Sequence, residues 1–452
     1  MSARGRRIAA VALKRAALGV VGARFGLTSP ARRRASFARQ ARLACEELGP
    51  GFIKLGQLAS VRPDIFSAET VFELEKLQDS VPPVPVEAVR RVIRADLGRE
   101  PEEIFASFED EPLASASIAQ VHRATLADEY AAVCGGSLSP GTRIVVKVVR
   151  PGAARTIEAD LQIARRWARR FSRMRSLERF NLEGFLDEFD ESLHSELDMR
   201  NEGRVADRFR FDFRDDPLVL VPRVVWSQTT RRVLTMEYIE GWRLTDITEA
   251  ERSGVDAYGL AVHGANVFMR QVLVFGRFHA DLHPANVFVT PDSRICYLDF
   301  GIIGRTQPRQ RVAIAQVLAA TVYGDADRAI RYSAELGLQI PKDKEIAVRD
   351  HVADLMSRTL SGPGRADVRG FAIGFLSMLS TYRIHVPRGY GLLIKALVTV
   401  EGCAQRLYPD IDIAGAAKPF ATRLIAREMM RPARLQVKLP DALRAAMREL
   451  AE

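Results

Sequence analysis

The stretch RFHADLHPANVFV, residues 277–289, places two histidines, an aspartate and an asparagine between apolar residues. Asp281 and Asn286 are five positions apart, and Asp299, in the sequence YLDFG, follows thirteen positions after Asn286. Phosphoryl transfer requires oxygen ligands for Mg²⁺ and a carboxylate beside the attacking oxygen, and an Asp, an Asn and a second Asp at these intervals supply them. Because an isolated DFG tripeptide is common by chance, the joint spacing is what indicates a phosphoryl-transfer site.

A lysine lies upstream in a predicted buried strand, RIVVKVVRPG, residues 143–152. Burying Lys147 among apolar residues is costly unless an acidic partner or a phosphate accompanies it, although a single lysine could also reach solvent from an edge strand. A small strand-rich region followed by a larger helical one, with polar motifs where the two meet, predicts an α+β, two-lobed nucleotide-binding fold.

Composition narrows the alternatives. The chain has 452 residues, 47% hydrophobic and 27% charged, which is typical of one large or two ordinary globular domains. The four cysteines lie far apart and form no C-x-x-C pair: Cys45, Cys134, Cys296 and Cys403. This spacing indicates neither a disulfide framework nor a zinc site and favours a reducing, cytoplasmic setting. The net charge of +10 is compatible with binding to nucleic acid. However, the sequence contains no zinc-finger spacing, aromatic-glycine RNA motif or basic-region heptad, so no nucleic-acid partner is expected.

The positive charge is concentrated at the N-terminus. Eleven basic residues precede Glu46 without one acid: Arg4, Arg6, Arg7, Lys14, Arg15, Arg24, Arg32, Arg33, Arg34, Arg39 and Arg42. Their alternation with apolar runs suits a helix on an anionic bilayer surface, an organelle transit peptide, or a helix that packs on the body with its arginines in water. No stretch reaches the roughly eighteen apolar residues that span a bilayer, so any association expected at the inner membrane is peripheral.

Four motifs in the correct order identify a family resemblance. They are KLGQ at residues 54–57, PLASASIAQVH at 112–122, ELD at 196–198 and HADLHPAN at 279–286. From about Phe52 to Arg305 the chain resembles the ABC1/UbiB/ADCK (AarF) family of atypical protein-kinase-like proteins. The resemblance implies an α+β, two-lobed protein-kinase-like fold with an N-terminal helical extension that carries the K-x-G-Q motif.

The resemblance also implies a domain order. We expect a basic, membrane-surface segment at 1–45, a helical extension at 46–110, a kinase-like N-lobe at 111–240 and a helical C-lobe at 241–452. Within the extension, two helices are predicted, the first in CEELGPGFIKLGQLASV, residues 45–61, and the second in SAETVFELEKLQ, residues 67–78. The runs at 218–228 and 231–244 are predicted to form a strand pair.

Roles in catalysis follow from the resemblance. Asp281 would orient or deprotonate the nucleophile, Asn286 and Asp299 would hold Mg²⁺, and Lys147 would contact the phosphates of ATP or ADP and pair with Glu202. The implied nucleotide-binding set is Ala114, Ser115, Ala116, Ser117, Lys147, Met236, Glu237 and Ile239. Met236 would be the gatekeeper beside adenine, and the carbonyl of Glu237 and the amide of Ile239 would be hinge contacts.

The ASASIAQ loop replaces the glycine-rich loop of ordinary kinases. Each Ala or Ser adds a Cβ and loses freedom at positive φ, so nucleotide handling is expected to differ. In the family this loop accompanies restrained, ATPase-like behaviour, although as a sequence it also suits a plain turn between two strands.

Lys54 and Gln57, at i and i+3, project from one helical face. The resemblance implies that they regulate access to the active site and that Lys54 meets Glu196 or Asp198. On one ideal helix Glu196 would point roughly 200° away from Asp198, which shares a face with Glu202, so the pairing of these acids with the two lysines stays open.

Two histidines flank the catalytic aspartate. His279 is expected to fix the loop by hydrogen bonding, and His283 replaces the lysine that Ser/Thr kinases place two residues beyond the aspartate. His283 is shared with aminoglycoside- and choline-kinase-like enzymes, which favours small-molecule or lipid chemistry. After Asp299 the sequence enters a helical pattern almost directly, without an A-P-E motif, so no platform for a peptide substrate is expected.

The sequence is therefore interpreted as an ATP-dependent atypical kinase or ATPase. By implication of the family, it would support synthesis or distribution of ubiquinone or another isoprenoid lipid, with an anionic membrane surface, an isoprenoid lipid and biosynthetic enzymes as partners. Two alternatives remain open: a small-molecule phosphotransferase resembling the aminoglycoside and choline kinases, which would not explain KLGQ or ELD, and a nucleotide-dependent scaffold without turnover.

Overall fold

The computed structural model describes most of the chain: residues 3–24, 30–60, 62, 66–77, 81–129, 138–171, 182–360, 366–382, 384, 387–412, 415, 419 and 422–423. The chain divides into two compact units. Unit 1 comprises Met1–Ser60, Ile65–Phe213 and Val221–Ile239, and unit 2 comprises Val61–Asp64, Arg214–Leu220 and Glu240–Glu452.

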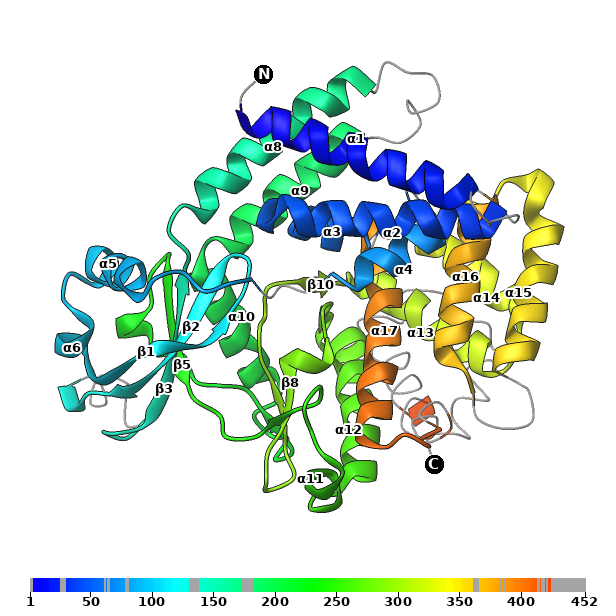
Figure 1. Ribbon diagram of the computed structural model, residues 1–452. Coiled ribbons are helices and arrows are strands. Elements are labelled where there is room, and N and C mark those ends of the chain that lie inside the picture. Colours follow the sequence, from blue (N-terminus) through cyan, green and yellow to red (C-terminus); the bar gives the residue numbers. More distant parts are fainter. Residues whose placement is uncertain are drawn as a thin grey trace. The chain divides into compact units, whose positions relative to one another are not determined.

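Unit 1 is built around a four-stranded antiparallel sheet in the order β1-β2-β3-β5 (Figure 1). Its strands are β1 (Phe105–Ser115), β2 (Ala119–Leu126), β3 (Arg143–Val149) and β5 (Val233–Glu237). Successive residues of a strand point to opposite faces. Val146 and Val148 are completely buried in an apolar cluster with α5 (Val86–Leu97), so Lys147 projects from the opposite face of the sheet.

The remaining helices of unit 1 are α1 (Ala3–Arg24), α2 (Pro30–Leu48), α3 (Pro50–Ala59), α4 (Ala68–Glu75), α6 (Pro101–Ile104), α8 (Ala153–Phe171), α9 (Leu182–Glu196) and α10 (Met199–Asp212). The single helix predicted over 45–61 was wrong, because the chain breaks at Gly49. Gly49 has φ +95°, a conformation that glycine adopts without strain, and Pro50 then occupies the first turn of α3.

The basic N-terminal helices belong to the core of unit 1. Ile8 and Val11 of α1 are buried with Leu48 of α2 and Ile163 of α8. Arg4 binds the buried Asp160 with two hydrogen bonds of 2.7 and 2.6 Å, and it also donates to the carbonyl of Leu48 at the end of α2. Three further basic residues pair with acids of unit 1 as Arg15–Glu47, Arg34–Glu69 and Arg42–Glu73.

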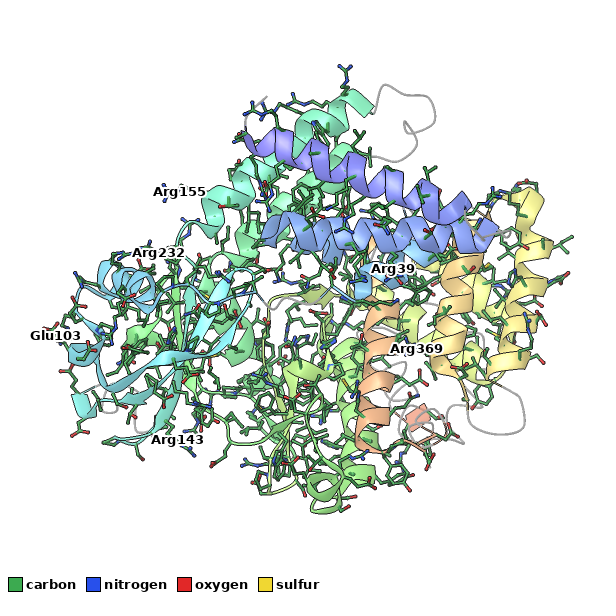
Figure 2. The ribbon with its side chains drawn as sticks, in the orientation of Figure 1. Arg39, Glu103, Arg143, Arg155, Arg232 and Arg369 are labelled. Carbon is green, nitrogen blue, oxygen red and sulfur yellow. The ribbon has the colours of Figure 1, made fainter. Side chains whose placement is uncertain are left out.

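Part of this basic surface stays in solvent. Arg39 of α2 and Arg155 of α8, both labelled in Figure 2, are exposed. The side chains of Arg24 and Arg32 lie outside the described residues. The expected alternative of helices that pack on the body therefore describes α1 and α2, which leaves their outer faces available for other contacts.

Unit 2 contains two small sheets, with strand orders β4-β9-β8-β6 and β10-β7. Their strands are β4 (Val219–Leu220), β6 (Trp242–Arg243), β7 (Arg277–His279), β8 (Val287–Val289), β9 (Ile295–Tyr297) and β10 (Ile303–Arg305). The helices are α11 (Glu249–Ser253), α12 (Ala257–Arg270), α13 (Pro308–Val322), α14 (Ala326–Glu335), α15 (Glu345–Thr359), α16 (Val368–Tyr382) and α17 (Arg388–Leu407). None of the described helices is long and apolar enough to cross a membrane.

The predicted strand pair at 218–228 and 231–244 was wrong in its extent. β4 pairs in parallel with β9 of unit 2, whereas β5 pairs with β3 of unit 1. The two runs meet only over a short stretch, where Val224 and Met236 form a bridge and the amides of Val225 and Glu237 donate to the carbonyls of Thr235 and Arg223. The alternation of apolar and polar residues in both segments is typical of a hairpin. The two strands nevertheless pair with different sheets, and β-propensity alone does not determine the partner of a strand.

The β8–β9 hairpin explains the spacing of the polar motifs in unit 2. Val287 pairs with Tyr297 at its open end, so Asn286, just before β8, lies opposite Leu298, just after β9. The amide of Leu298 donates to the carbonyl of Asn286 over 2.9 Å. The interval of thirteen positions from Asn286 to Asp299 is thus the length of one short hairpin.

Candidate active site

Lys147 and Glu202 form a charged pair inside unit 1. Lys147 Nζ lies 2.8 and 2.9 Å from the two carboxylate oxygens of Glu202, which is on the first turn of α10. Their side chains are only 15% and 9% exposed. Removing one partner of a buried pair leaves the other charge uncompensated. Loss of either residue is therefore expected to lower the free energy of unfolding by about 3–5 kcal/mol.

The assumption that Glu196, Asp198 and Glu202 share one helix was wrong. Helix α9 ends at Glu196, and Asp198 is the N-cap of α10, where its side chain accepts a hydrogen bond from the amide of Arg200. The break turns Glu196 toward α3, and Lys54 Nζ lies 3.0 Å from its carboxylate. A hydrogen bond from the Arg200 side chain holds the pKa of Asp198 below its usual value.

The glycine of the K-x-G-Q motif has a packing role. A Cβ on the buried Gly56 would approach the side chain of Leu77 to 2.4 Å and that of Cys45 to 3.3 Å, so a larger residue would require Leu77 to shift. Gln57, one residue on, directs its amide at the carbonyl of Leu77 over 3.5 Å. Lys54 and Gln57 therefore contact different partners, Glu196 and the end of the α4 segment.

The alanine-rich loop is a tight connection between β1 and β2. The amide of Ala116 donates to the carbonyl of Ala119 over 2.8 Å, and Arg150, just after β3, donates to the carbonyl of Ala116 and the hydroxyl of Ser115. Ser117 is 1% exposed, and among the described residues its hydroxyl has no hydrogen-bond partner. Ala114 lies in the last part of β1.

The predicted adenine-side residues lie at the end of β5. Met236 is buried within the strand, Glu237 is its last residue, and Ile239 is buried just beyond it. The amide of Glu237 donates to the carbonyl of Arg223 over 2.9 Å. Met236 and Glu237 lie on the strand next to the one that carries Lys147.

In unit 2, His279 organises the loop that carries Asp281. The ring is completely buried, Nδ1 accepts from the amide of Asp281 over 3.2 Å, and Nε2 donates to the carbonyl of Leu298 over 3.3 Å. Burial lowers the pKa of His279, which agrees with this neutral tautomer. The histidine thus joins the loop to the segment that carries Asp299.

Asp281, Asn286 and Asp299 are brought together by these contacts and by the hairpin. The side-chain amide of Asn286 donates to the carbonyl of Asp281 over 3.3 Å. Asp299 has φ +55°, one of two non-glycine residues with positive φ among those described. Such a conformation is uncommon outside glycine and is typical of functional sites, where the surrounding structure enforces it.

Sequence analysis missed a residue of α17. Lys395 Nζ donates to Asp281 Oδ1 over 3.0 Å, and the two side chains are 16% and 35% exposed. Two turns further along the same helix, the thiol of Cys403 donates to the carbonyl of Leu282 over 3.0 Å. Burial raises the pKa of Cys403 to about 12, so this thiol stays protonated and can donate. No local spacing could have identified Lys395, which lies 114 positions after Asp281.

His283 caps the short turn that leads to Asn286. Its Nδ1 accepts from the amide of Ala285 over 3.2 Å, and burial lowers its pKa. Beyond Asp299 the chain passes through β10 and enters α13 at Pro308. The segment between Asp299 and α13 is therefore short.

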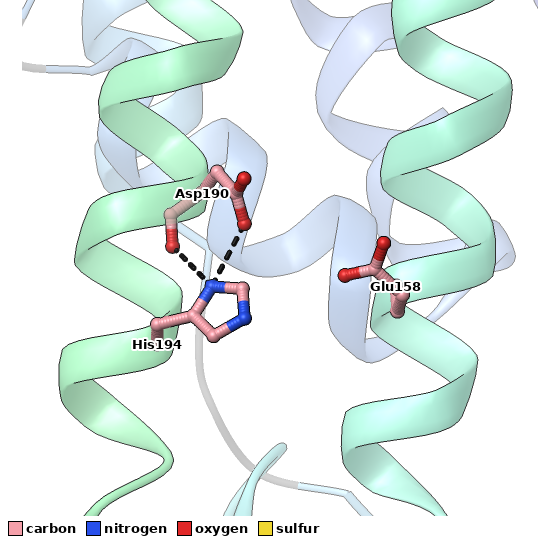
Figure 3. A group of neighbouring side chains, drawn as sticks. All are labelled: Glu158, Asp190 and His194. Carbon is pink, nitrogen blue, oxygen red and sulfur yellow. Dashed lines mark hydrogen bonds and ion pairs between the residues drawn. The ribbon is translucent and has the colours of Figure 1, made fainter.

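A separate acidic and histidine group in unit 1 has ordinary protein partners. Ligand atoms of Glu158, Asp190 and His194 lie within 4.8 Å of one another on α8 and α9, and Figure 3 shows His194 directed at Asp190. Nδ1 of His194 donates to the Asp190 carbonyl over 2.9 Å, Arg165 donates to the Asp190 carboxylate, and Gln162 donates to Glu158. The positive charge of Arg165 opposes a cation here, so we interpret the group as a polar link between two helices.

Comparison with protein families adds independent information. Residues 76–333 match the model of the ABC1 atypical kinase-like domain, and residues 372–412 match the UbiB helical domain. The second match contains α17 and therefore Lys395.

Several proteins resemble the chain over most of its length. The Marinobacter nauticus protein named probable protein kinase UbiB is 34% identical over 394 residues, covering 84% of this chain and 68% of the relative. Its Cellvibrio japonicus namesake is 33% identical, covering 86% and 70%. The Arabidopsis thaliana protein ACTIVITY OF BC1 COMPLEX KINASE 7, chloroplastic, is 33% identical, covering 87% of this chain and 55% of that protein. A solved complex of Rv3197 with erythromycin, from Mycobacterium tuberculosis, covers 73% of this chain and 84% of that one, with 24% identity and a TM-score of 0.49.

Proposed function

Because the chain belongs to the ABC1 family of atypical kinase-like proteins, we propose that it binds Mg-ATP and hydrolyses it in a reaction coupled to a lipid surface. The fold is α+β and kinase-like, with a helical extension before the sheet. The lipid would be ubiquinone or another isoprenoid, whose synthesis or distribution the protein would support, as the name UbiB of two relatives suggests.

The observation that carries the proposal is the arrangement of Asp281, Asn286 and Asp299 in unit 2. One loop and one hairpin bind the first two residues together and hold the third with φ +55°. Asp281 would orient or deprotonate the attacking water or hydroxyl, since a carboxylate is the group that phosphoryl transfer uses there.

The donor set fits Mg²⁺. Asn286 and Asp299 offer amide and carboxylate oxygens, the ligand type that this hard cation prefers, and they would hold it. When bound, Mg²⁺ neutralises charge on the phosphate oxygens. Lys147, already fixed by Glu202, would hold the phosphates, and the buried Ser117 hydroxyl, for which no partner is described, is suited to donate to a phosphate oxygen. In the same proposal, Ala114, Ser115 and Ala116 border the phosphates, and Met236, Glu237 and Ile239 border the adenine.

Regulation of the site is proposed to involve the extension. Lys54 is held by Glu196 immediately before the break at Asp198, and α10 begins after that break and carries Glu202. Movement of α3, with Lys54 and Gln57, would therefore change the position of Glu202, which holds Lys147. This continuity is the physical basis for assigning a regulatory role to the K-x-G-Q helix.

The outer face of α1 supports a peripheral lipid contact. Leu13, Val20 and Val21 are 77%, 51% and 51% exposed, and their spacing places them on one side of the helix. The exposed Arg6 and Lys14 flank this face. Exposed aliphatic side chains bordered by basic residues suit the headgroup region of an anionic bilayer.

The test is phosphate release from Mg-ATP by the full chain, with and without anionic vesicles and a phenolic mimic of an isoprenoid headgroup. Activity that rises with lipid and disappears in Asp299→Asn is the expected result. Nucleotide binding without turnover in every condition would favour the scaffold, and transfer of phosphate to a small hydroxyl compound instead of water would favour a small-molecule phosphotransferase.

A further inference from the structure

The loop that carries Asp281 supplies no permanent cation of its own. Residues 279–286 contain neither lysine nor arginine. His283 does not replace one, because its Nδ1 accepts from the amide of Ala285 and the ring is therefore neutral in this arrangement. Phosphoryl transfer places negative charge on the terminal phosphate oxygens and is accelerated by cations beside them. The proposed function already places Lys147 and Mg²⁺ at the phosphates, and a further positive group beside Asp281 would have to come from elsewhere in the chain.

Lys395 of α17 is placed to be that group. Its neighbours Ile394 and Ala396 are 7% and 0% exposed, and its own side chain is only 16% exposed, so the ammonium is held in the interior instead of reaching solvent. Its Nζ donates to Asp281 Oδ1 over 3.0 Å. A group within hydrogen-bond distance of this carboxylate is also close to whatever oxygen the carboxylate activates.

A second contact fixes α17 along the same loop. Cys403 donates to the carbonyl of Leu282, the residue after Asp281, over 3.0 Å. Positions 395 and 403 are two turns apart and share a helix face. The backbone of the loop is thus already attached through Cys403, so attachment alone does not require a lysine at 395 directed at a carboxylate.

We propose that Lys395 is a working residue of the nucleotide site: it positions Asp281 and contributes the positive charge toward the terminal phosphate of ATP. This inference rests on the proposed function. In the absence of nucleotide the ammonium neutralises the carboxylate, and when ATP is bound it is shared between Asp281 and the terminal phosphate. ADP lacks that phosphate and gains nothing from the shared charge.

The experiment compares Lys395→Met, Lys395→Arg and the unchanged full chain. Dissociation constants are measured for ADP and for a β,γ-imido analogue of ATP in the presence of Mg²⁺, together with the thermal unfolding midpoint. Lys344→Met is the matched control, since Lys344 is another lysine of unit 2, and its Nζ donates to the carbonyl of Tyr382 over 3.0 Å.

We expect Lys395→Met to raise the dissociation constant of the ATP analogue about tenfold or more, because the loss of a hydrogen bond between charged groups has an effect of this size. The dissociation constant of ADP should change less than about twofold. Lys395→Arg should restore most of the preference for the triphosphate, and Lys344→Met should leave it unchanged. Equal losses for both nucleotides, or no loss, would overturn the role of Lys395. Failure of the unchanged chain to bind either nucleotide would overturn the proposed function and this inference together.

Discussion

Lys54 Nζ lies 3.0 Å from Glu196 Oε2, which joins the K-x-G-Q helix to the C-terminal end of α9. The end of a helix carries partial negative charge on its free carbonyls, so a carboxylate there needs a cation nearby. Lys54 compensates both charges, and its side chain and that of Glu196 are 16% and 12% exposed. The lysine is therefore required for the local structure as well as for any regulatory role.

Replacing Lys54 tests that structural role. Lys54→Met should lower the free energy of unfolding by about 1–3 kcal/mol, since it leaves a mostly buried carboxylate without this partner. Lys76→Met is the control, because Lys76 is 60% exposed beside Glu73, and such surface pairs contribute about 0–1 kcal/mol. Urea unfolding measures both. The double variant with Glu196→Gln should recover part of the loss; an additive result would contradict direct coupling.

The pair of Lys147 and Glu202 predicts coupled effects on nucleotide binding. Lys147→Met should weaken the binding of Mg-ATP at least tenfold. Glu202→Gln should also weaken it, because Lys147 then loses the carboxylate that fixes it. Equilibrium binding of a fluorescent nucleotide is the measurement. Lys14→Met, which removes an exposed lysine paired with Glu47, should bind like the unchanged chain. Normal affinity in Lys147→Met would leave the lysine a purely structural role.

Asp299 allows a substitution that separates charge from backbone strain. Its φ of +55° is tolerated by asparagine but poorly by alanine or β-branched residues. Asp299→Asn should therefore keep the unfolding free energy close to that of the unchanged chain while reducing phosphate release by about a hundredfold or more. The dependence of nucleotide affinity on Mg²⁺ should also weaken. If Asp299→Asn retains both turnover and Mg²⁺ dependence, Asp299 is not a ligand of the metal.

His122 gives a prediction for pH. The ring is buried in β2, Nδ1 donates to the carbonyl of Glu109, and Nε2 accepts from Gln120, an arrangement of the neutral form. Burial lowers the pKa of His122 below its unfolded value of about 6.5. Below that pH the unfolded chain binds the proton and the folded chain does not, so unfolding becomes easier as pH falls.

The measurement is the free energy of unfolding between pH 7.5 and pH 5.5 for the unchanged chain and His122→Gln. The slope should be shallower in the variant, by at most about 1.4 kcal/mol per pH unit. Parallel slopes would mean that His122 takes up its proton equally in both states.

The exposed aliphatic face of α1 predicts vesicle binding. Leu13→Gln combined with Val20→Gln should reduce flotation with anionic vesicles about tenfold, because each aliphatic side chain contributes roughly 1–3 kcal/mol when buried in an apolar medium. Ile346→Gln is the control, since Ile346 is 68% exposed on α15. Deleting the N-terminal residues would be a poor test, because Ile8, Val11 and Arg4 belong to the core of unit 1. Unchanged flotation of the double variant would exclude this face as the membrane contact.

The features that the sequence predicted well are set by local geometry. Asp281, Asn286 and Asp299 lie on one loop and one hairpin, so their spacing along the chain determines their proximity. The strand that carries Lys147 was equally visible, because its apolar neighbours define a buried β-strand. In both cases a few residues contain the whole signal.

The remainder depended on tertiary contacts. The pairing of Lys54 could not be assigned from one ideal helix, because the break between α9 and α10 reorients Glu196. The sequence LGPG, residues 48–51, signals the break at Gly49. The contact of Lys395 with Asp281 could not be predicted, because the fold brings α17 to the loop and no residue near Asp281 in the sequence indicates this contact.

The bond between Asp281 and Lys395 joins two segments of the chain that match separate domain models. Asp281 lies in the segment that matches the kinase-like domain, and Lys395 lies in the segment that matches the helical domain. A protein shortened after residue 333 would retain the three catalytic-loop and hairpin residues and lose the cation beside the first of them. Exchange of the kinase-like segment with that of a relative should therefore preserve the proposed phosphate release only when α17 is exchanged with it.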